Sequence, residues 1–81
     1  MRYVVVLDQG PTSWGAYVPD LPGCVAVGKT REEVERLIRD AVHLHLDSMR
    51  EDGDPIPAPG TWTTVVDVDD APAAQAQAAA G

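Results

Sequence analysis

Two prolines and a glycine lie within residues 17–24, YVPDLPGC, and they constrain the fold more than any other stretch of the chain. Both prolines hold φ near about −65° and lack an amide hydrogen, and the residue before each is pushed toward extended geometry. Gly23 can supply the positive φ that a chain reversal needs. This stretch, which we call the corner, is therefore predicted to be a stiff connection between two strands.

Three short segments around the corner are predicted to be strands. The first is residues 2–8, in which residues 3–7 are an aromatic and β-branched apolar run without a polar break, which is typical of a central strand covered on both faces. Residues 14–18 place Trp14 and Tyr17 on opposite faces. After the corner, residues 24–27 form a short apolar run that ends at a glycine.

A long amphipathic helix is predicted over residues 31–52. Thr30 and Glu33 form a capping box at its start, and Gly53 is a typical left-handed stop. The apolar side chains cover roughly 200° of the helix circumference, whereas packing against one sheet needs a stripe of about 100°. The excess lies on the side of Val42 and Leu46, which indicates a second neighbour.

The composition of the chain after residue 53 changes twice, from proline-rich to β-branched and then to alanine-rich. Residues 54–60 have a proline at every second position and are predicted to be an extended polyproline-like segment, which we call the strap. Residues 62–68, the arm, read as a fourth strand. We expect one domain over residues 1–69 and a disordered alanine-rich tail over residues 70–81.

This order of elements predicts an α+β fold, βββαβ, with a mixed four-stranded sheet in the order 3-2-1-4 and one helix on one face. One helix leaves the other face of the sheet uncovered, so that face needs a partner. A small domain also needs support beyond its own core, and the single cysteine allows no internal disulfide. We therefore expect a homo-oligomer, in which a second copy is the simplest cover. The residues expected at its interface are Tyr3, Val5, Tyr17, Val42 and Leu46.

The formal net charge of −7 argues against binding to a phosphate backbone and suits a basic partner protein. No apolar run approaches the roughly 20 residues of a membrane span, and the N-terminus lacks a signal-peptide pattern. Together with a lone thiol, these features predict a cytoplasmic protein without membrane association.

The sequence does not indicate a catalytic site. The carboxylates available to a metal-dependent nuclease are Asp8, Glu33 or Glu35, and Asp67, and nothing in the pattern makes them converge. Cys24 reads as a small buried hydrophobic residue, and His45 as a structural hydrogen-bonding residue on the apolar helix face. We expect no enzyme activity, no catalytic residue, no metal and no cofactor.

Four motifs in order resemble the N-terminal domain of the HicB-like antitoxin family, over about residues 2–68. They are the corner, GKTREE at 28–33, AVHLHL at 41–46 and GDPIP at 53–57. The resemblance implies a partial ribonuclease-H-like fold, a dimer or tetramer, and binding to a HicA-like toxin, a small basic protein that cleaves messenger RNA. Many members also carry a C-terminal DNA-binding segment. The residues after Val68 are acidic and then alanine-rich, so we expect neither DNA binding nor autoregulation.

Two functions follow from the resemblance. The first is an antitoxin that occludes the active face of a HicA-like toxin, with Asp20 and Leu21 of the corner, and Asp8 nearby, as the expected contacts. The second is a solitary oligomeric structural or regulatory module of the same fold without a toxin.

Overall fold

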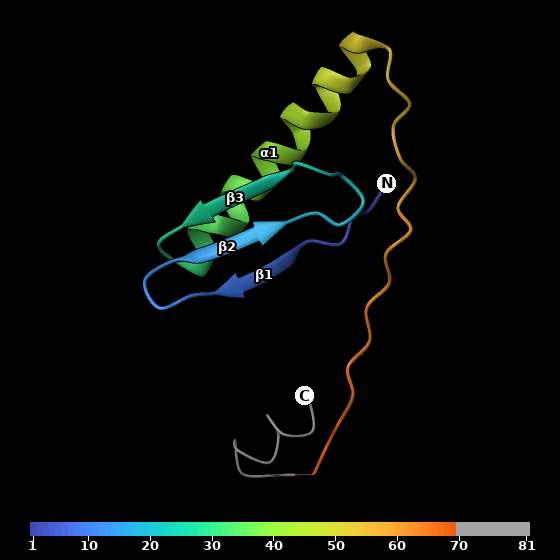
Figure 1. Cartoon of the computed structure of the whole chain (residues 1–81). Helices are drawn as coiled ribbons and strands as arrows, with labels where there is room; N and C mark the ends of the chain where they lie inside the picture. The colour runs from blue at the N-terminus through green and yellow to red at the C-terminus, as the bar shows by residue number, and fades with distance from the viewer. Residues whose placement is uncertain (70–81) are drawn as a thin grey trace.

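A computed structural model describes residues 1–69 and shows one helix packed on a three-stranded antiparallel sheet (Figure 1). The sheet order is β1-β2-β3. The elements are β1 (Val6–Gln9), β2 (Trp14–Tyr17), β3 (Val25–Gly28) and α1 (Arg31–Asp52). The α+β class and the relative order of the first three strands are as predicted.

The strand register divides the sheet into two faces. Leu7, Ala16 and Ala26 lie side by side across the strands and belong to the core that α1 covers. Val6, Tyr17 and Val25 form the neighbouring row, and because side chains alternate along a strand, this row belongs to the other face, which no helix or strand within residues 1–69 covers. We call that second surface the open face.

The corner has the stiff geometry predicted for it. Gly23 takes a φ of 85°. The Val18 amide donates to the Cys24 carbonyl at 3.2 Å, and the Cys24 amide donates to the Leu21 carbonyl at 3.0 Å. The Leu21 side chain is 0% exposed. The corner therefore fastens β2 to β3 and also supplies part of the core.

Helix α1 begins and ends where the sequence predicts. The Glu33 amide donates to Oγ1 of Thr30 at 3.1 Å, which satisfies one of the free amides of the first turn. The Glu33 carboxylate accepts from the Lys29 amide at 2.9 Å, one residue earlier than in the standard capping box. Gly53, with φ of 72°, ends the helix by donating its amide to the Arg50 carbonyl.

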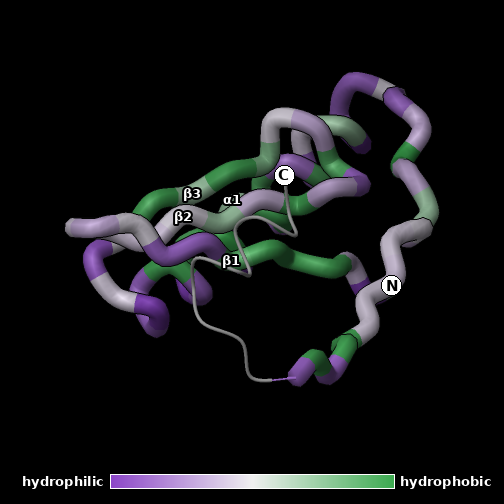
Figure 2. The backbone as a smooth tube through the Cα atoms, turned by 60° about the horizontal axis from the view of Figure 1, so that its bottom comes forward, coloured by the Kyte–Doolittle hydropathy of each residue, from purple (hydrophilic) through white to green (hydrophobic). Residues whose placement is uncertain are grey.

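The hydrophobic core lies between the helix-facing side of the sheet and α1. Strand β3 and the chain that leads into the first half of β1 are hydrophobic, whereas the end of β1, the connection after it and the residues beyond the helix are more polar (Figure 2). Burial follows this division. The buried residues are Ala16, Val18, Leu21, Cys24, Val34, Ile38 and Leu46.

The four-stranded sheet is not confirmed, and neither is the ribonuclease-H-like fold. The arm pairs with no strand of the described chain, and β1, predicted to be central, is an edge strand that starts only at Val6. The physical reason is that a strand needs a ladder partner, and the arm runs away from its own sheet (Figure 1). The tail predicted over residues 70–81 lies outside the described residues.

Candidate partner-binding surfaces

Asp20 of the corner holds the end of the strap. Its Oδ2 accepts from the amides of Gly60 and Thr61 at 3.0 and 3.1 Å, and its Oδ1 accepts from Oγ1 of Thr61 at 3.0 Å. A second attachment lies upstream, where the Tyr3 hydroxyl donates to the Pro57 carbonyl. The strap is thus fastened to the body at two points.

These contacts change the acidity of Asp20. The Gly60 amide has the largest effect and lowers the pKa of the Asp20 carboxyl below its ordinary value of 3.8. Partial desolvation acts in the opposite direction, and the Thr61 hydroxyl and amide lower the pKa further. The carboxylate is therefore the form that binds the strap, because a charged acceptor is favoured by several donors.

The corner residues predicted to contact a partner have internal roles in this structure. Asp20 is engaged with the strap, and Leu21 lies in the core, where no partner can reach it while the corner keeps this shape. Sequence reasoning missed Gly60 and Thr61 as the partners of Asp20, because the contact spans 41 residues and no local pattern announces it. A direct contact between Asp20 and a partner stays a prediction.

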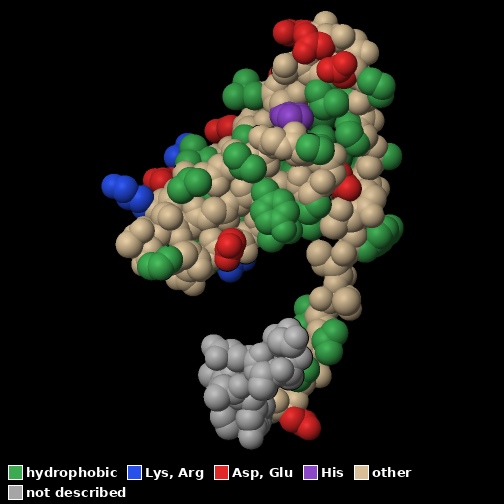
Figure 3. Space-filling view, in the orientation of Figure 1, with side chains coloured by type: hydrophobic (Ala, Val, Ile, Leu, Met, Phe, Trp, Pro, Cys, Tyr) green, Lys and Arg blue, Asp and Glu red, His purple; other side chains and the backbone are tan. Residues whose placement is uncertain are grey.

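The open face is the first candidate surface. Tyr17, Val25 and Val27 are 47, 63 and 67% exposed there. Asp8, also exposed, belongs to the same face, and its neighbour on β2 is Gly15, which leaves the carboxylate uncovered. The strands lie in front of α1 in Figure 1, so Figure 3 shows this side, with hydrophobic side chains over the sheet and acidic ones among them. The structure thus brings the predicted residues Asp8 and Tyr17 onto one face.

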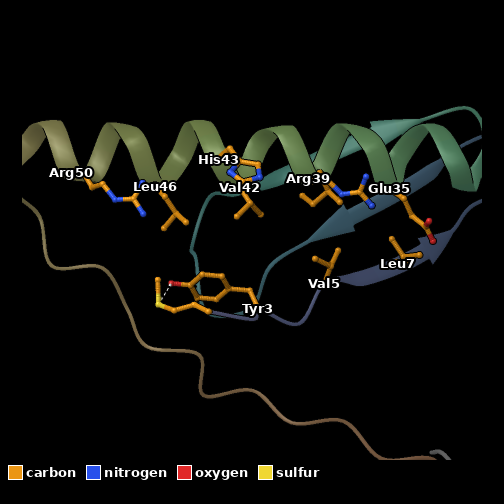
Figure 4. Close-up of a pocket in the computed structure, with 11 residues that line it drawn as sticks. Tyr3, Val5, Leu7, Glu35, Arg39, Val42, His43, Leu46 and Arg50 are labelled. Atoms are coloured by element: carbon orange, nitrogen blue, oxygen red, sulfur yellow. Dashed lines mark hydrogen bonds between the residues drawn. The ribbon is translucent and has the colours of Figure 1, made fainter.

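The second candidate surface is a groove of about 530 Å³ between the N-terminal segment and α1. Tyr3, Val5 and Leu7 point toward the helix from one side, and Val42 and Leu46 face them from α1 (Figure 4). Charged and polar residues also line it. These are Glu35, Arg39, His43 and Arg50.

The groove collects four of the five residues predicted for an oligomer interface. Tyr3, Val5, Val42 and Leu46 line it, whereas Tyr17 belongs to the open face on the other side of the sheet. The excess apolar surface of the helix, predicted from its wide arc, therefore borders this groove. Whether another copy occupies the groove stays a prediction at this point.

The carboxylates considered for a nuclease do not converge. Glu33 binds the Lys29 amide, and Glu35 pairs with Arg31 at 3.0 Å. Within residues 1–69, no cluster of three or more His, Cys, Asp or Glu side chains has a geometry that could hold a metal ion. Burial raises the pKa of the Cys24 thiol, which keeps it protonated and poorly nucleophilic.

The one helix that the structure describes is too polar to cross a membrane. His43 is exposed and lies along the groove. His45, predicted near the middle of the apolar helix face, is half-buried.

Comparison with known proteins agrees with the motifs. Residues 3–78 match a family described as the HicB-like antitoxin of bacterial toxin–antitoxin systems. The chain is 38% identical over 61 residues to Antitoxin HicB 2 of Photorhabdus laumondii, which covers 75% of this chain and 44% of that protein. It is also 31% identical over 58 residues to a UPF0150 protein of Thermoplasma acidophilum, covering 70% of this chain and 84% of that protein.

The two kinds of match differ in how much of each protein they cover. The chain spans less than half of the length of the Photorhabdus antitoxin. The family match, in contrast, runs from the first predicted strand through the helix and the arm. The protein therefore belongs to the HicB-like antitoxin family of bacterial toxin–antitoxin systems.

Proposed function

We propose that the protein is an antitoxin that neutralises a HicA-like, messenger-RNA-cleaving toxin in the cytoplasm by covering its active face. The observation that carries this proposal is the family match over residues 3–78, supported by 38% identity to Antitoxin HicB 2. An antitoxin acts by binding, so the proposal includes no catalytic step, no metal and no cofactor.

Charge supports a basic partner. The chain has a formal net charge of −7, and a toxin that binds RNA needs a basic surface to hold phosphates. Opposite potentials accelerate encounter and fix orientation when two such proteins meet. An acidic antitoxin can therefore compete with RNA for the same face of the toxin.

The open face is the surface that best fits this role. It combines exposed Tyr17, Val25 and Val27 with the uncovered carboxylate of Asp8. An apolar centre with aromatic and charged residues is typical of binding surfaces. We infer that Asp8 contacts the toxin directly, while Asp20 and Leu21 act by holding the corner beside it in shape.

Co-expression with any small basic protein encoded beside this gene tests the proposal. We expect the two proteins to co-purify and the growth arrest caused by the toxin to be relieved. The Asp8→Lys variant should weaken both effects, because it places a positive charge against a basic partner. Asp40→Lys, an exposed acid on α1, is the matched control with the same change in net charge.

The outcomes separate the two functions. If no adjacent basic protein exists and none co-purifies, the antitoxin proposal fails and the solitary oligomeric module takes its place. If both lysine variants weaken binding equally, the overall charge matters but the open face is not the contact surface. DNA binding is not part of the proposal.

A further inference from the structure

We propose that the arm, residues 62–68, adds as a fourth strand to the free edge of β1 in a second copy of this chain, so that two copies exchange arms. The four-stranded sheet expected from the sequence would then form between chains rather than within one. The inference does not depend on the toxin, because it rests on surfaces that this chain presents by itself.

The arm exposes its hydrophobic side chains almost completely. Trp62 is 91% exposed and Val65 is 90% exposed, and Val66 and Val68 follow at 74 and 82%. Single exposed apolar residues are ordinary, but a contiguous set on an extended segment marks an interaction site. The segment is rich in β-branched residues and contains no proline, so it is well suited to pair in a sheet.

The body offers the matching surface. β1 is an edge strand, so one row of its amides and carbonyls has no ladder partner within the described chain. The groove that Tyr3, Val5 and Val42 line runs beside this edge, beneath α1. A strand added to β1 would lay one set of alternate side chains into the groove and the other set onto the open face, and both surfaces are apolar.

The attachment of the strap favours a second copy over the arm's own body. Thr61 is held by Asp20, and the strap before it is stiffened by prolines, so the point where the arm leaves the body is fixed. From that point the chain continues away from its own sheet (Figure 1). The start of the arm shares a shallow pocket with Arg2 and Val4 of its own chain, and a return to its own β1 would require the chain to leave this path after Thr63, whereas a partner can meet the arm as it stands.

The dimensions are sufficient for a stable dimer. Seven residues of strand span about 23 Å, which exceeds the four-residue length of β1 and reaches the residues before it. The Trp62 side chain alone carries about 200 Å² of surface. With three valines on each arm, two exchanged arms and the surfaces they cover reach the ~1,200–2,000 Å² typical of specific interfaces.

Light scattering and isotope-filtered NMR on the full chain test the exchange. At micromolar concentration we expect a dimer, and a Trp62→Asp/Val65→Asp variant should be a monomer that keeps the helical circular dichroism signal. Leu44→Asp is the control, because Leu44 is 70% exposed on α1 and does not line the groove. It should remain a dimer.

A mixture of labelled and unlabelled wild-type chains identifies the occupant without relying on a variant that folds. We expect intermolecular contacts between the arm and the residues Val5 and Leu7. A monomeric wild-type protein would overturn the proposal, and so would a dimer whose arm-to-β1 contacts are only intramolecular. A dimer that survives the double aspartate substitution would also overturn it, because the copies would then meet through another surface, such as the open face.

Discussion

The corner and the arm are both short segments with apolar side chains, but the first is buried and the second is exposed. The corner buries Val18, Leu21 and Cys24 at 3% exposure or less, whereas Trp62 and Val65 of the arm stay at 90% or above. The difference lies in the backbone. The amides of Val18, Leu21 and Cys24 find acceptors within six residues along the chain, while the arm needs a strand from elsewhere. Apolar composition alone therefore does not decide burial.

The largest expected loss of stability comes from creating a cavity in the corner. Leu21→Ala should lower the free energy of unfolding by about 2–5 kcal/mol, because the side chain is fully buried and its removal leaves a void. Val65→Ala in the arm should change it by less than about 0.5 kcal/mol at concentrations where the chain is monomeric. Urea denaturation of both variants measures the difference. Equal losses would show that the arm is packed in the single chain.

A smaller effect is expected where β3 meets α1. A Cβ on Gly28 would lie 2.9 Å from the Val34 amide nitrogen, so Gly28→Ala forces the helix away from the strand. We expect a loss of about 1–3 kcal/mol, as for overpacked sites. Gly15→Ala is the control, since its Cβ would meet only the Asp8 carbonyl oxygen at 4.0 Å. Thermal melting should separate them, and a neutral Gly28→Ala would contradict the close packing.

The helix cap should contribute less again. Thr30→Ala removes the acceptor for the Glu33 amide and should cost about 1 kcal/mol of stability. Thr63→Ala changes the same atoms on the exposed arm, so it should leave the unfolding midpoint unchanged at concentrations where the chain is monomeric. If the two variants match, Thr30 does not stabilise the start of α1.

The smallest effect concerns the contact between body and strap, and it depends on pH. The pKa of Asp20 is below 3.8 in the folded protein, so its contribution to stability is present above pH 3.8 and is lost as the pH falls through the folded pKa. The amide resonances of Gly60 and Thr61 should shift in that acidic window. Asp20→Asn should abolish the titration and loosen the strap at neutral pH, and a titration midpoint above 3.8 would contradict the assignment.

The candidate site shows where sequence reasoning succeeds and where it stops. The wide apolar arc of α1 predicted a second neighbour near Val42 and Leu46, and the structure places both residues along an open groove. The corner was predicted to present Asp20 and Leu21, but the structure turns Asp20 toward the strap and Leu21 into the core. Local chemistry showed that the corner is stiff. It could not show which way its side chains point, because that depends on what packs against them.

The sequence by itself determined the elements whose signals are local. The cap at Thr30, the stop at Gly53 and the reversal at Gly23 all lie where the residue types require them, because each depends on neighbours a few residues away. Only the tertiary structure decided whether residues 62–68 pair with a strand of their own chain. Their β-branched pattern specifies a strand but not its partner, since pairing depends on which edge lies within reach once the strap is fastened to Asp20.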